Sequence, residues 1–238
     1  MSVLAATDIN IGEHITAKFL GLTFNLDTIW STVVAGAIVT GLGVYMARRA
    51  THRVPSRLQL AFETVVDTVQ RQVESAIGPV APFVVPLAVT LFLFILLANW
   101  LSLIPSGHHP EYLPPPTADV NLTYVLALLV ISWAVVVGLR RRGLKNYLRG
   151  YFKPYWYMFP INIIEQLAKP VSLSLRLFGN LFAGGIMLLL ISLLPAVIIP
   201  PFNIIWKLFD LFIGLIQAVI FALLTILYFA HELGEGSH

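Results

Sequence analysis

The stretch FNIIWKLFDLFIGLIQAVIFALLTILYFA, residues 202–230, decides the class of fold, because only Lys207 and Asp210 within it are charged. About 20 consecutive apolar residues suffice to cross the hydrocarbon core of a bilayer, so this run can span a membrane. The whole chain agrees with it: 58% of the 238 residues are hydrophobic and 11% are charged. An ordinary soluble domain carries about 25% charged residues. The sequence therefore predicts an integral membrane protein.

Further apolar segments upstream predict one all-α, polytopic membrane domain over residues 1–238, with about five transmembrane helices. The predicted spans are residues 29–46, 83–103, 122–139, 161–194 and 202–232. Residues 55–77 differ from these spans, because apolar side chains recur there at helical spacing opposite a charged face. That pattern predicts an amphipathic helix that lies along the membrane surface.

The last two spans are separated by residues 195–201 and are predicted to form a hairpin. At 1.5 Å per residue, the segment 161–194 would be about 50 Å long, whereas the hydrocarbon core is about 30 Å thick. An upright helix would overshoot the core, so we expect both helices of the hairpin to be strongly tilted or bent. Pro170 provides a place for a bend.

Basic residues predict the orientation of the chain. Eleven of the 15 lysines and arginines lie between spans one and two or between spans three and four, and none lies in the other two connections. Cytoplasmic connections are enriched in Lys and Arg, so the N-terminus is expected outside and the C-terminus in the cytoplasm. The N-terminal residues have neither the pattern of a cleaved signal peptide nor that of a transit peptide, which favours a bacterial plasma membrane.

Several kinds of chemistry find no support in the sequence. There is no cysteine, which excludes disulfides, thiolate catalysis and cysteine-ligated metal clusters. No nucleophile motif, phosphate-binding loop or metal-ligand spacing occurs, so no cofactor, no metal and no catalysis by this chain alone are expected. The basic residues flank apolar runs instead of forming a stripe with aromatics, which argues against nucleic-acid binding.

Arg176 is the most deeply placed cation of the fourth span. An arginine at the centre of a bilayer costs about 2.5 to 3.5 kcal/mol on insertion scales, so it should face protein or water and meet an acidic or polar group. Small or polar residues share its helical face: Ser172, Gly179, Asn180 and Ala183. Small residues let another helix approach closely. Arg176 therefore either forms a static bridge with Asp210 or meets a carboxylate of a partner.

The last span carries a second line of polar groups, because Asp210, Gly214, Gln217 and Phe221 fall on one helical face. A line of titratable and hydrogen-bonding groups suits proton movement. Alternatively, Lys207 and Asp210 only anchor the end of the helix near an interface. Other polar residues either line an aqueous cavity or cap helices: Asn99, Asp119, Asn121 and Glu165. Asp119 precedes the third span in the manner of an N-cap.

The run KPVSLSLRLFGN, residues 169–180, resembles the signature of subunit a of F-type ATP synthases, the stator half of a rotary proton channel. Further stretches that resemble the family follow its order along the chain: Asn99, residues 118–121, residues 160–162 and residues 215–221. The resemblance implies a bacterial membrane subunit whose last two helices lie strongly tilted against a rotating ring of c subunits.

The resemblance also implies roles for single residues. Arg176 would be the essential stator arginine, which meets the ring carboxylate and keeps two offset half-channels apart, with Gln217 and Asn180 close to it. The outward-facing inlet would be lined or supported by Asn99, Thr117, Asp119 and Asn121. The outlet would involve Glu165 and Lys169, and the face toward the ring would include Ser172, Gly179 and Ala183.

One departure from the family pattern concerns the inlet. Some members carry an acidic residue nine positions after the arginine and a histidine seven before the glutamine, where this chain has Gly185 and Asp210. Asp210 is therefore expected to be the proton relay of the inlet.

The implied partners are the c-subunit ring, b-type subunits of the peripheral stalk, other ATP synthase subunits and membrane lipid. Two other readings exist: an independent ion channel or secondary transporter, and a non-conducting scaffold. The chain shows no internal repeat, which argues against the duplicated architecture of many transporters. A scaffold would not need intramembrane charges, which are costly to bury.

Overall fold

A computed structural model of the protein describes residues 16–19, 22–50, 55–78, 83–101, 116–144, 183–187, 189–195 and 197–234, with single helical positions at 164, 168, 171, 172, 175 and 179. Its main elements are the strands β1 (Thr16–Phe19) and β2 (Leu22–Asn25), the helices α1 (Leu26–Arg49), α2 (Arg57–Ile77), α3 (Val84–Trp100), α4 (Val120–Arg142) and α7 (Ile199–Gly234), and the 3-10 turn η2 (Pro116–Ala118).

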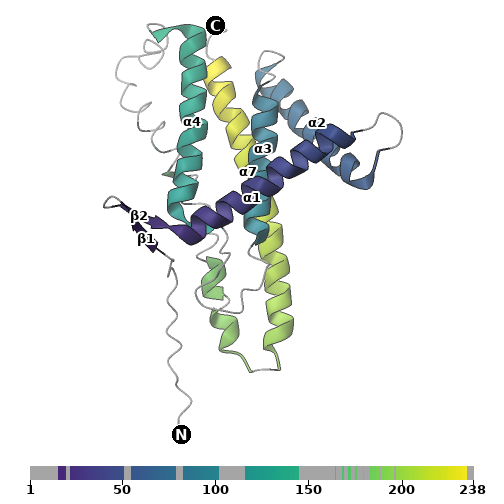
Figure 1. Ribbon diagram of the computed structural model, residues 1–238, viewed down its shortest axis with the longest axis vertical. Coiled ribbons are helices and arrows are strands. Elements are labelled where there is room, and N and C mark those ends of the chain that lie inside the picture. The colour runs from purple at the N-terminus through teal and green to yellow at the C-terminus, as the bar shows by residue number, and fades with distance from the viewer. Residues whose placement is uncertain are drawn as a thin grey trace.

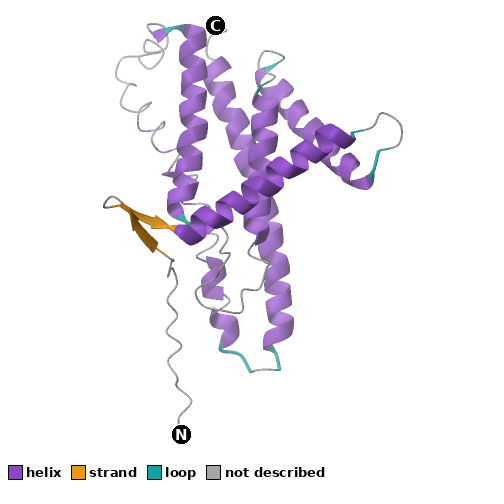
Figure 2. Ribbon diagram, viewed as in Figure 1, coloured by secondary structure: helices purple, strands orange, loops and turns teal. Residues whose placement is uncertain are grey.

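Three of the described helices are long and apolar enough to cross a membrane, namely Leu26–Arg49, Asn121–Arg141 and Ile199–Leu233. Val84–Trp100 is a shorter apolar helix. The predicted class, an all-α polytopic membrane protein, is confirmed. Figure 2 shows one addition to it, a small antiparallel hairpin of β1 and β2 ahead of α1, in which Thr16 pairs with Asn25. Its four-residue strands are too short to give a periodic signal in the sequence.

The helix ends follow local chemistry. Ser56 caps α2, because its hydroxyl accepts a hydrogen bond from the backbone N–H of Gln59 at 3.2 Å. At the other end of the chain, α7 begins at Ile199, inside the segment 195–201 that was expected to be a break. Pro200 and Pro201 therefore lie in the first turn of α7, where the missing proline N–H would have had no partner within the helix.

The core forms where α2, α3, α4 and α7 meet. Phe221 of α7 is fully buried among Ile95 of α3 and Val130 of α4. A second cluster joins α2 to the same helices through buried Val73 and Phe229. Between membrane helices, van der Waals packing of such side chains is a main source of stability. Because the apolar side of α2 packs on α3 and α7, its charged side remains exposed.

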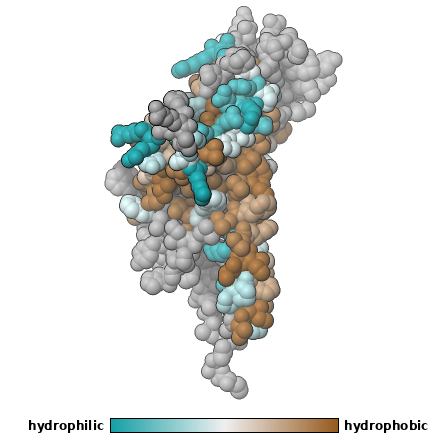
Figure 3. All heavy atoms as spheres, turned by 90° about the vertical axis from the view of Figure 1, so that its right-hand side faces the viewer, coloured by the Kyte–Doolittle hydropathy of each residue, from teal (hydrophilic) through white to brown (hydrophobic). Residues whose placement is uncertain are grey.

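The long helices α3, α4 and α7 run along the length of the molecule, and α1 crosses them obliquely (Figure 1). The N-terminal half of α7 extends beyond the end of α3, and the described residues 183–187 and 189–192 lie beside it there. Hydrophilic side chains gather near α2 and the end of α1, while the extended half of α7 is largely hydrophobic (Figure 3). On this face, the described residues therefore form a polar region near α2 and a long apolar region along α7.

Candidate functional site

A chain of buried polar groups begins at Asn99, in the last turn of α3. The Asn99 side-chain amide donates a hydrogen bond to the backbone carbonyl of Gly214 on α7, with an N–O distance of 3.2 Å. Its Oδ1 accepts a hydrogen bond of 2.7 Å from the hydroxyl of Thr117 in η2. Asn99 is 8% exposed and Thr117 is fully buried. Asn99 thus links α7 to the turn that precedes α4.

Asp119 continues the chain of polar groups and also caps α4. Its Oδ1 accepts a hydrogen bond from the backbone N–H of Asn121 at 2.8 Å, which confirms the predicted N-cap. Its Oδ2 accepts two more, from Nδ2 of Asn25 at 2.8 Å and from the hydroxyl of Thr28 at 3.1 Å. The buried carboxylate of Asp119 therefore ties the start of α1 to the start of α4.

The start of α1 contributes polar residues that were not among the predicted site residues. Asp27, Thr28 and Ser31 are all buried, and Oδ1 of Asp27 accepts a hydrogen bond of 2.9 Å from the backbone N–H of Thr28. The Ser31 hydroxyl has no hydrogen-bond partner among the described residues. A signal for this face exists in the sequence, because Asp27, Ser31, Ala35 and Val39 recur every four residues.

On α7 the predicted polar face is the packed face of the helix. Gly214 is buried, Gln217 is 4% exposed and Phe221 is fully buried. Nε2 of Gln217 has no hydrogen-bond partner within the described part of the chain. Asp210 lies one turn before Gly214 and is partly exposed. Its Oδ1 would lie 4.0 Å from a Cβ atom added to Gly184, so Asp210 faces the segment 183–187.

The remaining predicted site residues fall into two groups, apart from Asn121. Arg176, Asn180, Glu165 and Lys169 lie outside the described residues. Ser172, Gly179 and Ala183 are helical and exposed. Asn121 lies two residues after Asp119, and its side chain is exposed instead of lying with Asn99 and Thr117.

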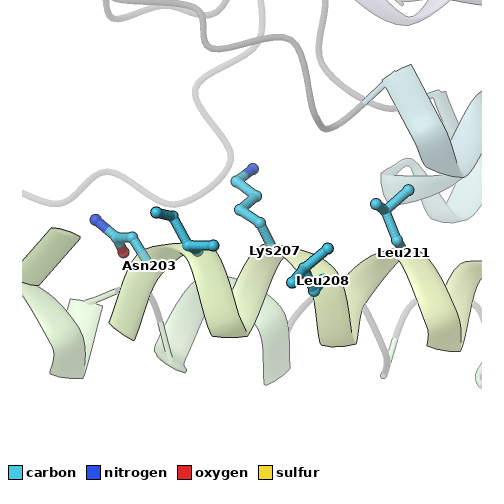
Figure 4. A pocket seen from close by; sticks show the side chains of 5 residues that line it. Asn203, Lys207, Leu208 and Leu211 are labelled. Atoms are coloured by element: carbon cyan, nitrogen blue, oxygen red, sulfur yellow. The ribbon is translucent and has the colours of Figure 1, made fainter. Parts of the chain in front are cut away.

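A hollow of about 240 Å³ lies along the extended half of α7, lined by Asn203, Ile204, Lys207, Leu208 and Leu211 (Figure 4). The labelled side chains all come from this one helix. Among the described lining residues, Lys207 and Asn203 offer polar side-chain atoms and the other side chains are apolar. The buried polar network near Asn99 is the better candidate for a functional site.

The network joins α1, α3, η2, α4 and α7 at one level of the molecule. Burying polar groups is unfavourable unless they are hydrogen-bonded, so such a concentration within an apolar body needs a structural or functional reason. No group of three or more His, Cys, Asp or Glu that could hold a metal occurs among the described residues. Hydroxyl, amide and carboxylate groups of this kind can hold helices together and can also bind water or a mobile proton.

Known proteins resemble this chain over nearly its whole length. The sequence model of a family described as "ATP synthase A chain" matches residues 28–230. A protein of Acidothermus cellulolyticus named "ATP synthase subunit a" is 56% identical over 98% of this chain and 86% of its own length. Proteins of the same name from Mycobacterium bovis and Bacillus pumilus are 49% and 35% identical, over 99% and 92% of this chain and 98% and 97% of their own lengths.

Proposed function

The chain belongs to the ATP synthase A chain family, and on that premise we propose that it is the a-type membrane subunit of a bacterial F-type ATP synthase. The match of the family over residues 28–230 is the observation that carries this proposal. In this role the subunit is not itself catalytic. It forms the stationary part of a proton channel and couples proton flow to rotation of a ring of c subunits.

The buried polar network supports the position of the inlet half-channel. Asn99, Thr117 and Asp119 converge at one end of α3 and α4, away from the amphipathic helix α2. Protons would enter there from outside the cell, pass the polar face of α7 and reach Asp210, the proposed relay. Asn121 is exposed beside this network, where it would line the mouth of the inlet.

The proposed control element is Arg176. Its positive charge would draw the proton off each arriving ring carboxylate and would keep the inlet from joining the outlet, with Gln217 and Asn180 close to it. Glu165 and Lys169 would serve the outlet. The exposure of Ser172, Gly179 and Ala183 supports a face that is open to a partner, for which we propose the c-ring. One charge that crosses 100 mV releases about 2.3 kcal/mol, so several crossings are needed per ATP.

The length of α7 supports the tilt that this role requires. Its 36 residues are about 54 Å long, against a hydrocarbon core of about 30 Å. Because α1 crosses α7 obliquely, the two helices cannot both stand upright in a membrane. A tilted α7 would keep its apolar surface within the core and lie along the curved surface of a ring.

The distribution of charge supports the proposed orientation and further partners. Arg48 and Arg49 end α1, Arg140 and Arg141 lie at the end of α4, and these two helix ends lie on the same side of the molecule as α2. A cluster of basic residues favours the cytoplasmic side, so the N-terminus would lie outside and the C-terminus in the cytoplasm. The exposed charged face of α2 could then contact b-type stalk subunits or lipid headgroups at this surface.

The test uses the assembled complex with the variant Arg176→Ala. The measurement is ATP-driven proton pumping in inverted membrane vesicles. We expect pumping and proton-driven ATP synthesis to be abolished while the amount of complex in the membrane stays near that of the wild type. The matched control is Arg49→Ala, because Arg49 is exposed at the end of α1 and lies outside the faces proposed to meet partner subunits. Wild-type pumping by Arg176→Ala would contradict the proposed channel, and absence of the complex would assign Arg176 a structural role.

A further inference from the structure

Two consecutive residues at the end of α3 hold α7 by its backbone. The Asn99 amide donates to the carbonyl of Gly214, and the Trp100 indole N–H donates to the carbonyl of Leu211 at 3.4 Å. Leu211 and Gly214 are one helical turn apart, and both lie between Asp210 and Gln217. The two hydrogen bonds therefore attach α3 to the part of α7 that lies between Asp210 and Gln217.

This close approach of α3 to α7 depends on the absence of a side chain at position 214. A Cβ atom added to Gly214 would lie 3.0 Å from Cβ of Asn99 and 3.6 Å from its Nδ2. The Cβ of Asn99 is fixed to the backbone of α3 and cannot rotate away, so the helices themselves would have to separate. By contrast, a Cβ atom added to Gly36 on α1 meets nothing within 4 Å.

The orientation of the Asn99 amide is also fixed. Its Oδ1 accepts the hydrogen bond from the buried Thr117 hydroxyl, so its Nδ2 is the atom available to the Gly214 carbonyl. Thr117 thus holds the oxygen of the same amide group whose nitrogen contacts α7. A donor that is supported in this way can define the position of the helix that it contacts.

Gln217 needs such support from the backbone. It is 4% exposed, and its Nε2 has no hydrogen-bond partner among the described residues, so no described contact of its own amide group fixes the helix. Asp210 and Gln217 are seven residues, or nearly two full turns, apart, so they lie on the same face of α7. A rotation of α7 about its axis would therefore turn both side chains away from their present directions.

From these observations we propose that Asn99, Trp100 and Gly214 form a clamp that sets the rotation and height of α7, and that Trp100 and Gly214 are positioning residues for Asp210 and Gln217. The inference rests on the function proposed above, because the position of α7 matters for proton transfer only in such a channel. A misplacement of about 1 Å at a reacting group can lower a rate by about a hundredfold.

The experiment compares Gly214→Ala with Gly36→Ala in the assembled complex, since both changes add one methyl group to a helical glycine. The position of α7 is read as the distance between spin labels on cysteines that replace Trp133 of α4 and Phe212 of α7. Both residues are exposed, and the chain has no cysteine of its own. Proton pumping per assembled complex is the second readout.

We expect Gly214→Ala to change the label distance and to lower pumping by about tenfold or more, and Gly36→Ala to leave both at their wild-type values. A loss of stability alone would lower the amount of complex without moving the labels. An unchanged label distance in Gly214→Ala would overturn the clamp, whether or not pumping is lost.

If the Gly214→Ala complex does not assemble, Trp100→Phe takes its place, because it removes one donor without adding volume. It should shift the label distance in the same direction, and an unchanged distance would overturn the clamp. Arg176→Ala separates this inference from the proposed function. Pumping by Arg176→Ala would refute the channel, whereas an inactive Arg176→Ala together with an unaltered α7 in the clamp variants would refute only the clamp.

Discussion

The bond between Thr28 and Asp119 allows the contribution of α1 to be measured. Thr28→Val removes the hydroxyl that donates to Oδ2 of Asp119 at 3.1 Å and keeps the size and branching of the side chain. A hydrogen bond to a charged group contributes about 1.5 to 3 kcal/mol, and a neutral one about 0.5 to 1.5 kcal/mol. Asp119 retains the donors Asn25 and the Asn121 backbone N–H, so we expect a loss near the middle of this range, about 1 to 2 kcal/mol.

The assay is a denaturant titration of the purified chain in mixed detergent micelles, followed by far-ultraviolet circular dichroism, which gives the free energy of unfolding. Thr32→Val is the matched control, because the Thr32 hydroxyl donates only to the Thr28 carbonyl of its own helix, at 2.6 Å. We expect Thr28→Val to lower the free energy of unfolding clearly more than Thr32→Val does.

A double-mutant cycle isolates the bond itself. Thr28→Val combined with Asp119→Ala, which removes the acceptor, should show a coupling energy of about 1 kcal/mol or more between the two positions. Two results together would refute the view that Asp119 ties α1 to α4. These are equal losses in the free energy of unfolding for Thr28→Val and Thr32→Val, and a coupling energy near zero between positions 28 and 119.

Two further predictions concern packing and capping. Phe221→Ala should lower the free energy of unfolding by about 3 to 5 kcal/mol, because Phe221 is fully buried where α3, α4 and α7 meet. Leu223→Ala, at a residue that is 43% exposed, should have a much smaller effect in the same titration, and similar losses would contradict the assigned core. Ser56→Ala removes the N-cap of α2 and should cost about 0.5 to 2 kcal/mol, seen as faster hydrogen exchange in the first turn of that helix. Ser75→Ala, which changes an exposed serine near the other end of α2, should leave that turn unchanged, and equal exchange in both variants would argue against the cap.

Much of the fold was predictable because the relevant signals are local. The apolar length of residues 202–230 required a membrane, and the alternation of charged and apolar residues in 55–77 required an amphipathic helix. Asp119 was recognisable as an N-cap because its partner, the N–H of Asn121, lies two residues away. The β1–β2 hairpin and the start of α7 at Ile199 were missed, since the strands are short and two prolines at a helix start resemble a loop.

The sequence by itself determined the membrane environment, the helical class and, through the run 169–180, the family to which the chain is similar. Only the tertiary structure decided which polar residues meet. Thr28 and Asp119 are 91 positions apart, and Asn99 and Gly214 are 115 apart. Hydropathy and capping depend on neighbours along the chain, whereas these contacts depend on where α1, α4, α3 and α7 cross, which packing of their buried faces sets. For that reason the sequence could identify Asn99 as a polar residue of interest, but only the structure showed that its amide donates a hydrogen bond to the backbone of α7.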